Sequence, residues 1–203
     1  NGAAIPPTPT VGAVGLIEDY ARRADFASMK PGDTLILVGE TKGELGASMY
    51  LREVLGREDG APPPVDLALE RRTGDLIRNL IQSRQATVVH DLSDGGLIAA
   101  VDEMALASNL GATLRMNSGT HAHILLFGED QARYLVAVSN PAAILAAASQ
   151  AGVHASVVGI AGGGRVVPPP RVRHGANDGE GLITVKRRHL DADHIRHFGE
   201  LAP

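Results

Sequence analysis

The chain has 203 residues and a formal net charge of −4, and 44% of its residues are hydrophobic but only 3% aromatic, so it can bury a core built from aliphatic side chains. The charge, and the lack of a basic stripe with interleaved aromatic residues, exclude a typical nucleic-acid-binding protein, and the lack of cysteine excludes disulfides and thiolate metal sites. No apolar run approaches the about 20 residues of a membrane helix and no signal peptide is visible, so we expect a cytoplasmic protein with no membrane or nucleic-acid partner.

The chain is expected to divide into three parts. Residues 1–19 form an extended, proline-rich segment followed by a first strand at 10–19, which ends a preceding domain. Residues 20–167 form one domain, and residues 168–203 form an irregular extension that begins with a triple proline. Three histidines of this extension (His189, His194, His197) match no compact metal-ligand spacing and indicate a solvated tail.

Within the central part, strands alternate with helices, which is typical of a layered α+β or α/β domain with a mixed sheet packed by helices. A turn at 31–33 leads into a buried strand at 34–38, and residues 45–54 are expected to form a short helix. Asp66 is a candidate N-cap for a helix whose apolar residues fall on one face. The remaining expected elements are strands at 86–89, 133–139, 153–160 and 182–185, and helices at 95–108 and 141–151.

The sequence HDLSDGGL at 90–97 is the strongest candidate for a ligand site, because it joins a strand to a helix through an acidic turn. Asp94 is a candidate N-cap, and Gly95 and Gly96 would let a ligand approach the backbone. The carboxylates of Asp91 and Asp94 beside a helix N-terminus would suit a bridging hard cation, with Mg²⁺ the best fit. The alternative is that Asp94 only caps the helix and Asp91 only hydrogen-bonds the turn.

A second polar segment lies at 129–133, at the entrance to a strand. Glu129 and Gln131 could face a ligand, or the segment could be a turn with a weak surface ion pair between an aspartate and Arg133. The lysine-containing loop at 39–43 lacks the order of a phosphate-binding P-loop. His90 is interpreted as a hydrogen-bonded structural histidine, and Ser93 does not lie in the nucleophile elbow of a hydrolase.

Taken in order, six motifs resemble phosphoribosylformylglycinamidine synthase, specifically the C-terminal domain of the second half of its large synthetase subunit, an AIR synthase-related C-terminal domain. They are AIPPTP at 4–9, VGL at 14–16, GELGAS at 43–48, PPVDL at 63–67, HDLSDGGL at 90–97 and LFGEDQARYL at 126–135. The resemblance covers roughly residues 4–167. It implies a part of an ATP-dependent ligase that converts formylglycinamide ribonucleotide and glutamine-derived ammonia to the amidine in purine biosynthesis.

The resemblance also implies site residues, cofactors and partners. Asp91 matches a magnesium-binding aspartate in the first half of the subunit, and the implied cofactors are Mg²⁺ and ATP or ADP. The implied partners are the rest of the synthetase subunit, a glutaminase subunit and a small accessory subunit. The implied nucleotide- or substrate-binding residues are Asp66, Asp94, Gly95, Gly96, Glu129, Asp130 and Gln131.

This chain departs from the family pattern at two of these positions. Asp130 stands where the first half has Ser and Asp66 where it has Gln, and both changes add negative charge. The second half of the subunit is an auxiliary site, no residue here matches the catalytic histidine of the family, and the nearby cations are Lys42 and Arg133. We therefore expect no catalytic residue in this chain, weak Mg-nucleotide binding that Asp91→Asn reduces, and no turnover by the isolated chain.

Two alternatives remain open at this point. The chain could be a non-catalytic interaction module, or the C-terminal domain of a related ATP-dependent synthetase or kinase. The ligand hypothesis makes two geometric predictions. Residues 33–160 should form one domain that includes the helices starting near Asp66 and Gly95, and Asp91, Asp94, Glu129 and Gln131 should surround one cleft with Asp66 at its edge.

Overall fold

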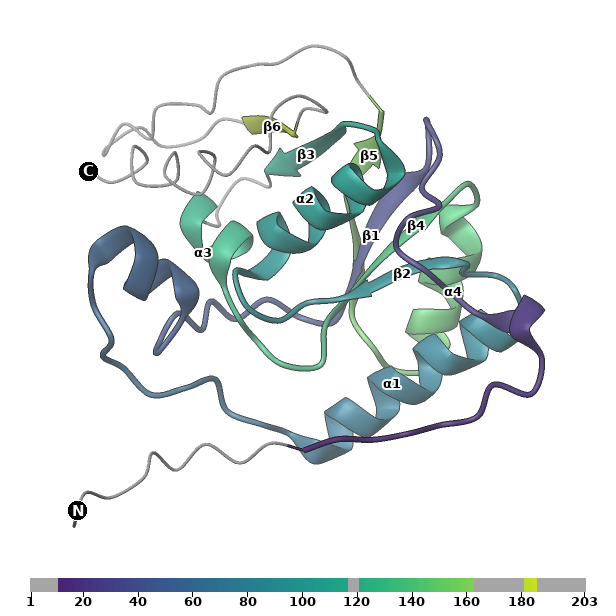
Figure 1. Ribbon diagram of the computed structural model, residues 1–203, viewed down its shortest axis with the longest axis horizontal. Coiled ribbons are helices and arrows are strands. Elements are labelled where there is room, and N and C mark those ends of the chain that lie inside the picture. Colours follow the sequence, from purple (N-terminus) through teal and green to yellow (C-terminus); the bar gives the residue numbers. More distant parts are fainter. Residues whose placement is uncertain (1–10, 117–120, 163–180, 186–203) are drawn as a thin grey trace.

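The computed structural model describes residues 11–116, 121–162 and 181–185, and it is organised around a six-stranded sheet with the order β2-β4-β1-β5-β3-β6 (Figure 1). Helices precede, separate and cover the strands. The strands are β1 (Thr34–Val38), β2 (Val88–Asp91), β3 (Ala112–Met116), β4 (Tyr134–Val138), β5 (Ala155–Ala161) and β6 (Gly181–Val185). The helices are η1 (Tyr20–Arg22), η2 (Tyr50–Val54), α1 (Leu67–Gln82), α2 (Gly96–Ser108), α3 (Ala122–Phe127) and α4 (Pro141–Gln150).

The pairing of the strands confirms the α+β class and corrects one detail of it. All five ladders between these strands are antiparallel. The one parallel pairing among the described residues is an isolated bridge between Asp25 and Val88. The ladders of the sheet are therefore antiparallel rather than mixed, and strands that follow one another in the sequence are not neighbours in the sheet.

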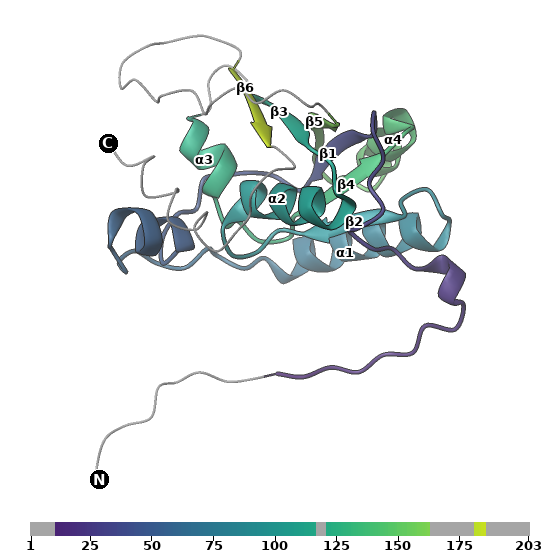
Figure 2. The ribbon, with the colours of Figure 1, turned by 45° about the horizontal axis from the view of Figure 1, so that its top comes forward.

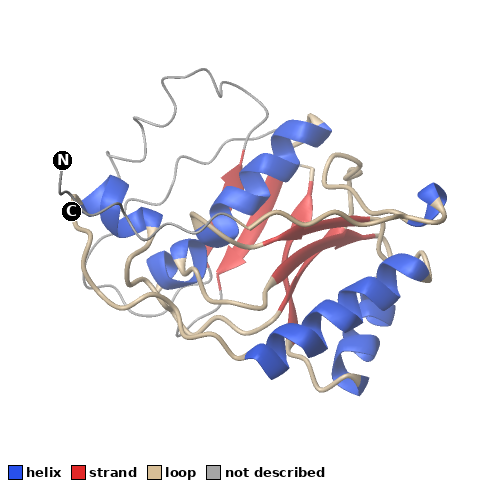
Figure 3. Cartoon of the chain, turned by 60° about the horizontal axis from the view of Figure 1, so that its bottom comes forward, coloured by secondary structure: helices blue, strands red, loops and turns tan. Residues whose placement is uncertain are grey.

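Helices cover both faces of the sheet (Figure 3). Side chains alternate along β1, so Leu35 and Leu37 join one hydrophobic cluster with α2 and α3, while Ile36 and Val38 join another with α1 and α4. Burial on both faces explains why this strand is a continuous apolar run rather than an alternating one. The prediction that the helices near Asp66 and Gly95 pack on one domain is confirmed.

Helix α1 forms as its sequence predicts. The Asp66 carboxylate accepts hydrogen bonds from the backbone N–H groups of Ala68 and Leu69, at 2.9 and 3.0 Å. These bonds satisfy two of the donors that the first turn of a helix leaves without intrahelical partners. Leu76, Ile77 and Leu80 are buried against the sheet. Pro141 likewise opens α4 at a position where its missing N–H costs nothing.

Several expected boundaries differ from the structure. Residues 11–19 form no strand; they are exposed and extend away from the domain (Figure 2), since no described neighbour pairs with them. Helical structure in 45–54 is confined to the π-helix η2. Strand β2 begins two residues later than expected and runs through Asp91, and the apolar stretch before Gly128 is the short helix α3.

The predicted strand at the end of the chain is confirmed as β6. The histidine-containing tail lies outside the described residues, as do residues 1–10, and the domain boundaries at 19 and 167 stay predictions. None of the helices within the described ranges is long and apolar enough to span a membrane.

Candidate functional site

The turn between β2 and α2 is closed by a distant side chain rather than by its own aspartate. Gly95, with φ +78°, occupies the N-cap position of α2, and no side chain within the turn caps the helix. Asp94 is exposed and is not the N-cap, which corrects the sequence prediction. The N–H of Gly95 instead donates to the Glu129 carboxylate at 2.8 Å. A residue 34 positions later in the chain thus fixes the N-cap residue of α2 through its own N–H, a different bond from the one that a capping side chain makes to the first turn.

The two aspartates of the turn are open to solvent. The side chain of Asp91 is 69% exposed at the end of β2, opposite Tyr134 in the strand register. Burial, and then the charges of Glu70 and Asp91, raise the pKa of Tyr134. The carboxylates of Asp91 and Asp94 are therefore available to a cation in a way that a buried carboxylate would not be.

Glycine at 96 is used for internal packing. Gly96 is buried with φ +66°, and a Cβ at this position would lie 2.5 Å from the carbonyl oxygen of Gly128. The backbone between α3 and β4 therefore takes the space that the sequence reading assigned to a ligand. Gly95, which is half-buried, stays the more accessible of the two glycines.

Glu129 joins two loops that are distant in sequence. Its Oε1 accepts from the N–H of Gly95 and from the N–H of Met49 at 2.9 Å, and its own N–H donates to the carbonyl oxygen of Glu44 at 2.9 Å. The loop before η2 and the turn before α2 are consequently held at one end of the sheet. Oε1 of Glu129 therefore holds two loops together, a role that the sequence of the 129–133 segment did not predict.

Asp130 is buried, at 3% exposure, and its carboxylate points at a loop backbone. It accepts from the consecutive N–H groups of Lys42, Gly43 and Glu44, at 3.0, 3.3 and 3.4 Å. Such a concave run of N–H groups is a nest, a common anion-binding arrangement of the backbone. Here the anion is supplied by the protein itself.

Arg133 packs beside Asp130 and hydrogen-bonds to the same loop. Its guanidinium is fully buried and donates to the carbonyl oxygens of Asp130 and Gly128 and to Oγ1 of Thr41. The nearest guanidinium nitrogen is 3.9 Å from the Asp130 carboxylate. Burial lowers the pKa of Arg133, against the opposing charges of Asp130 and Glu129. We call Gly128, Glu129, Asp130 and Arg133 the buried clasp.

The buried clasp corrects two expectations. The aspartate–arginine pair is not a surface pair, because both side chains are almost completely inaccessible. Arg133 is also out of reach of a phosphate bound at the exposed turn before α2, because its guanidinium is fully buried and donates to the clasp and to Thr41. The position of Arg133 in the sequence could have indicated its burial, because it directly precedes a buried strand. Burying an arginine there costs free energy unless several acceptors surround it.

A narrow hollow of about 30 Å³ lies beside the clasp, between the start of α1 and the loop after β1. Asp66, Asp130 and Gln131 line it together with Lys42. Hydrogen bonds from the N–H groups of Leu69 and Ala68 lower the pKa of Asp66. Asp66 and Gln131 are exposed at the rim, whereas Asp91 and Asp94 lie outside this hollow.

The predicted residues therefore meet at one end of the sheet without lining one cavity. Leu92 N donates to Arg133 O at 3.0 Å, which places the acidic turn directly against the 129–133 segment. The prediction that these residues surround one cleft is wrong for the hollow beside the clasp, which Gln131 and Asp66 line but Asp91, Asp94 and Glu129 do not. The ligand-binding roles of the predicted residues stay predictions.

His90 is a structural residue, as expected. Its Nδ1 lies 2.6 Å from the carbonyl oxygen of Asp91, its Nε2 lies 2.7 Å from the Glu103 carboxylate, and its ring packs against Phe26 with centroids 4.9 Å apart. The contact with Glu103 ties β2 to α2, and the contact of Nδ1 with the Asp91 backbone holds the ring at the end of β2.

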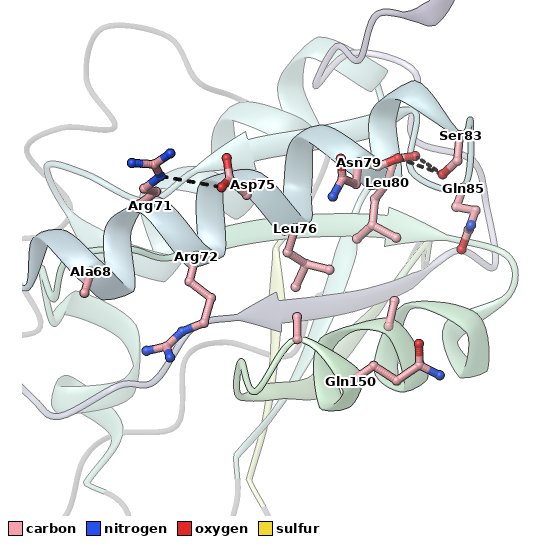
Figure 4. Close-up of a pocket in the computed structure, with 12 residues that line it drawn as sticks. Ala68, Arg71, Arg72, Asp75, Leu76, Asn79, Leu80, Ser83, Gln85 and Gln150 are labelled. Carbon is pink, nitrogen blue, oxygen red and sulfur yellow. Dashed lines mark hydrogen bonds and ion pairs between the residues drawn. The ribbon is translucent and has the colours of Figure 1, made fainter.

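A larger groove, of about 830 Å³, lies elsewhere, between α1 and α4 (Figure 4). Leu76 and Leu80 point from α1 toward α4, Arg72 and Gln150 flank the space between the two helices, and Arg71 also contributes to the lining. Sequence reasoning did not identify it, because its apolar residues are those of ordinary amphipathic helices. No predicted site residue lines it.

Comparison with known proteins gives a consistent result. The profile of the family described as AIR synthase related protein, C-terminal domain, matches residues 30–168. The phosphoribosylformylglycinamidine synthase subunit PurL of Caulobacter vibrioides is 67% identical over 163 residues, which cover 80% of this chain and 22% of that protein. The PurL of Beijerinckia indica is 52% identical over 165 residues, with the same coverage of both chains.

Solved structures share the fold. The structure described as Thermotoga maritima PurL complexed with FGAR has a TM-score of 0.60 at 19% identity and covers 70% of this chain and 26% of that one. The structure described as Thermotoga maritima PurL complexed with ATP has a TM-score of 0.54 at 20% identity, covering 68% of this chain and 23% of that one. This chain thus spans about a fifth of the length of the curated relatives that it matches.

Proposed function

Since this chain belongs to the family of AIR synthase related C-terminal domains, we propose that it is part of the large subunit of a phosphoribosylformylglycinamidine synthase. The observation that carries this proposal is the 67% identity to a PurL subunit over 80% of the chain. In that enzyme an ATP-dependent ligase would convert formylglycinamide ribonucleotide and ammonia to the amidine. A complete subunit would supply the residues for chemistry, and this domain would not turn over substrate by itself.

Within that enzyme, the domain is proposed to hold half of an auxiliary nucleotide–Mg²⁺ site at the turn before α2. Asp91 and Asp94 are exposed there, and the half-buried Gly95 lies between them and α2. Glu129 holds the turn in place through the N–H of Gly95. A turn fixed in this way presents its carboxylates without needing to reorganise when a ligand binds.

The residues present are compatible with Mg²⁺ only if a nucleotide is bound as well. Among the described residues there is no group of three or more histidine, cysteine, aspartate or glutamate side chains that could hold a metal. Mg²⁺ prefers six oxygens and commonly takes one or two carboxylates together with phosphate oxygens and water. Asp91, with Asp94 nearby, would supply the protein ligands, and the metal would neutralise phosphate charge at this acidic turn.

Titration with Mg-ADP tests the half-site. We expect weak, saturable binding by isothermal calorimetry and a higher Tm, because a ligand that binds only the folded chain stabilises it. Asp91→Asn should lower the affinity by about tenfold or more, equivalent to the loss of one charged metal contact of about 1.4 kcal/mol. ADP with EDTA in place of Mg²⁺ should bind more weakly still.

Asp19→Asn is the matched control, since Asp19 is also exposed but lies in the extended segment at 11–19, outside the acidic turn. It should bind Mg-ADP as the unmodified chain does. Equal affinity for the Asp91 and Asp19 variants would place any nucleotide elsewhere. Synthesis of the amidine by the purified chain, lost on substitution of Asp91 or Glu129, would contradict the auxiliary assignment.

The proposed partners are the remainder of the synthetase subunit, a glutaminase and a small accessory subunit. A structure described as PurLQS from Thermotoga maritima shares the fold, with a TM-score of 0.50 over 72% of this chain. Co-expression of the chain with the missing part of its subunit, followed by size-exclusion chromatography, tests whether the two parts assemble. Separate elution of two folded parts would contradict this arrangement.

A further inference from the structure

The loop from Thr41 to Glu44 is built like a receptor for an anion. Its consecutive N–H groups at 42, 43 and 44 converge on one carboxylate, and Gly43 has φ +92°, which a side chain would disfavour. Nests of this kind bind phosphate groups in many proteins, because the aligned N–H dipoles favour negative charge. The occupant in this chain is the side chain of Asp130.

A buried cation strengthens the same preference. The guanidinium of Arg133 is fully buried and lies 3.9 Å from the Asp130 carboxylate. A buried arginine needs a compensating negative charge close by. Both the loop backbone and the guanidinium therefore require an anion at this point of the structure, whichever molecule provides it.

A route to solvent exists on one side of Asp130. The hollow of about 30 Å³ is lined by Asp130 and by Lys42, the exposed residues Asp66 and Gln131 stand at its rim, and Glu40 and Glu44 also contribute to its lining. It has room for only about one or two water molecules, so it is too small for a phosphate group while the Asp130 side chain is in place. Removal of that side chain would enlarge the hollow as far as the nest.

We propose that residues 41–44 and Arg133 form a phosphate-type anion site that Asp130 keeps filled with its own carboxylate. A phosphate monoester is thereby excluded from this position in the unmodified chain and admitted once Asp130 is replaced by a small neutral residue. Asp130 is thus a specificity-determining residue. The nest is separate from the nucleotide half-site at Asp91, so a failed Mg-ADP titration would leave this inference untouched.

Inorganic phosphate is the probe, titrated into the 203-residue chain carrying Asp130→Ser at constant ionic strength. The backbone amide resonances of residues 42–44 should shift in a saturable manner. The Tm should rise by roughly 3–6 °C once phosphate is about tenfold above its Kd, as expected for a ligand that binds only the folded chain. The unmodified chain should show neither response.

Asp66→Ser is the matched control, because it removes one carboxylate from the same hollow while Ser can still cap α1. It should not create phosphate binding at residues 42–44. Binding there by the unmodified chain or by the Asp66 variant would overturn the proposal, since general loss of charge would then explain it. Ribose 5-phosphate in place of inorganic phosphate should give the same amide shifts if a monoester fits.

If the Asp130→Ser variant does not fold, the proposed phosphate site can still be tested by refolding. If Asp130→Ser is unfolded in phosphate-free buffer, phosphate should restore the far-ultraviolet circular dichroism of the folded chain, and sodium chloride at equal ionic strength should not. Failure of phosphate to refold that variant would overturn the proposal. Absence of amide shifts in a folded variant would do the same.

Discussion

Asp91 and Asp130 lie in two acidic segments that meet at the same end of the sheet, yet the side chain of Asp91 is 69% exposed and that of Asp130 is 4% exposed. Asp91 ends a strand that leads into a turn, whereas Asp130 faces three N–H groups and a buried guanidinium. Aspartates in neighbouring motifs thus have opposite physical roles. The number of donors that surround a carboxylate, not its place in a polar motif, decides whether it is free to bind a ligand.

The largest expected effect comes from removing the cation of the buried clasp. Arg133→Met leaves buried acceptors on Gly128, Asp130 and Thr41 without their donor, and we expect a loss of about 3–5 kcal/mol in the free energy of unfolding. Urea denaturation followed by circular dichroism measures it. Arg78→Met is the control, because Arg78 forms an exposed ion pair with Asp75 and should cost less than about 1 kcal/mol. Similar losses of unfolding free energy in both variants would contradict the prediction that the buried arginine contributes more to stability than an exposed one.

A smaller effect is expected at the residue that links the clasp to the acidic turn. Glu129→Ala leaves the N–H groups of Met49 and Gly95 unpaired and should cost about 2–3 kcal/mol, whereas Glu129→Gln keeps a carbonyl acceptor and should cost about 1 kcal/mol. Denaturation measures the cost, and amide hydrogen exchange at positions 49 and 95 locates it. Unchanged exchange at both amides in the alanine variant would mean that Glu129 does not hold these loops.

Asp102 adds a third case to the comparison of Asp91 with Asp130, a half-buried carboxylate that has no hydrogen-bond donor within the described part of the chain. The carboxylate of Asp102 on α2 accepts no hydrogen bond from another described residue, and burial, with a contribution from the charge of Glu103, raises its pKa to about 6. The folded state therefore holds this proton more tightly than the unfolded state does. Its effect on stability is fully favourable below about pH 4 and is lost as the pH rises through about 6.

Asp102→Asn should consequently increase the free energy of unfolding by roughly 1–2 kcal/mol at pH 7.5 and leave it unchanged at pH 4. Denaturant titrations of both chains across this pH range measure the difference. Glu103→Gln is the control for the charge of the neighbouring residue, which contributes less than burial does. A pH-independent difference between Asp102→Asn and the unmodified chain would contradict the ionisation argument.

Local patterns were sufficient where a feature depends on near neighbours in sequence. The cap of α1 by Asp66, the proline at the start of α4 and the buried strand at 34–38 were all predicted and confirmed. Each depends on contacts within a few residues or on one apolar run. The family could also be identified from short motifs, because the spacing of unusual residue types carries that information.

Local patterns failed where a distant segment supplied the partner. Asp94 satisfies the rule for an N-cap, but Gly95 takes that position, and its N–H donates to the distant Glu129. The apolar residues at 11–17 satisfy the rule for a strand, but no described strand lies beside them. A local propensity for a cap or a strand does not determine the structure by itself, because a strand also needs a neighbouring strand to pair with.

The sequence by itself determined the alternation of strands and helices, the family and the position of the acidic turn, because these follow from residue type and spacing along the chain. Only the tertiary structure decided which carboxylates are available. Asp130 and Arg133 are buried together because the loop at 41–44 folds over them, across about ninety positions of sequence. Burial and hydrogen-bond satisfaction are properties of the packed chain, and they assign the same residue type to a structural role at Asp130 and to an exposed one at Asp91.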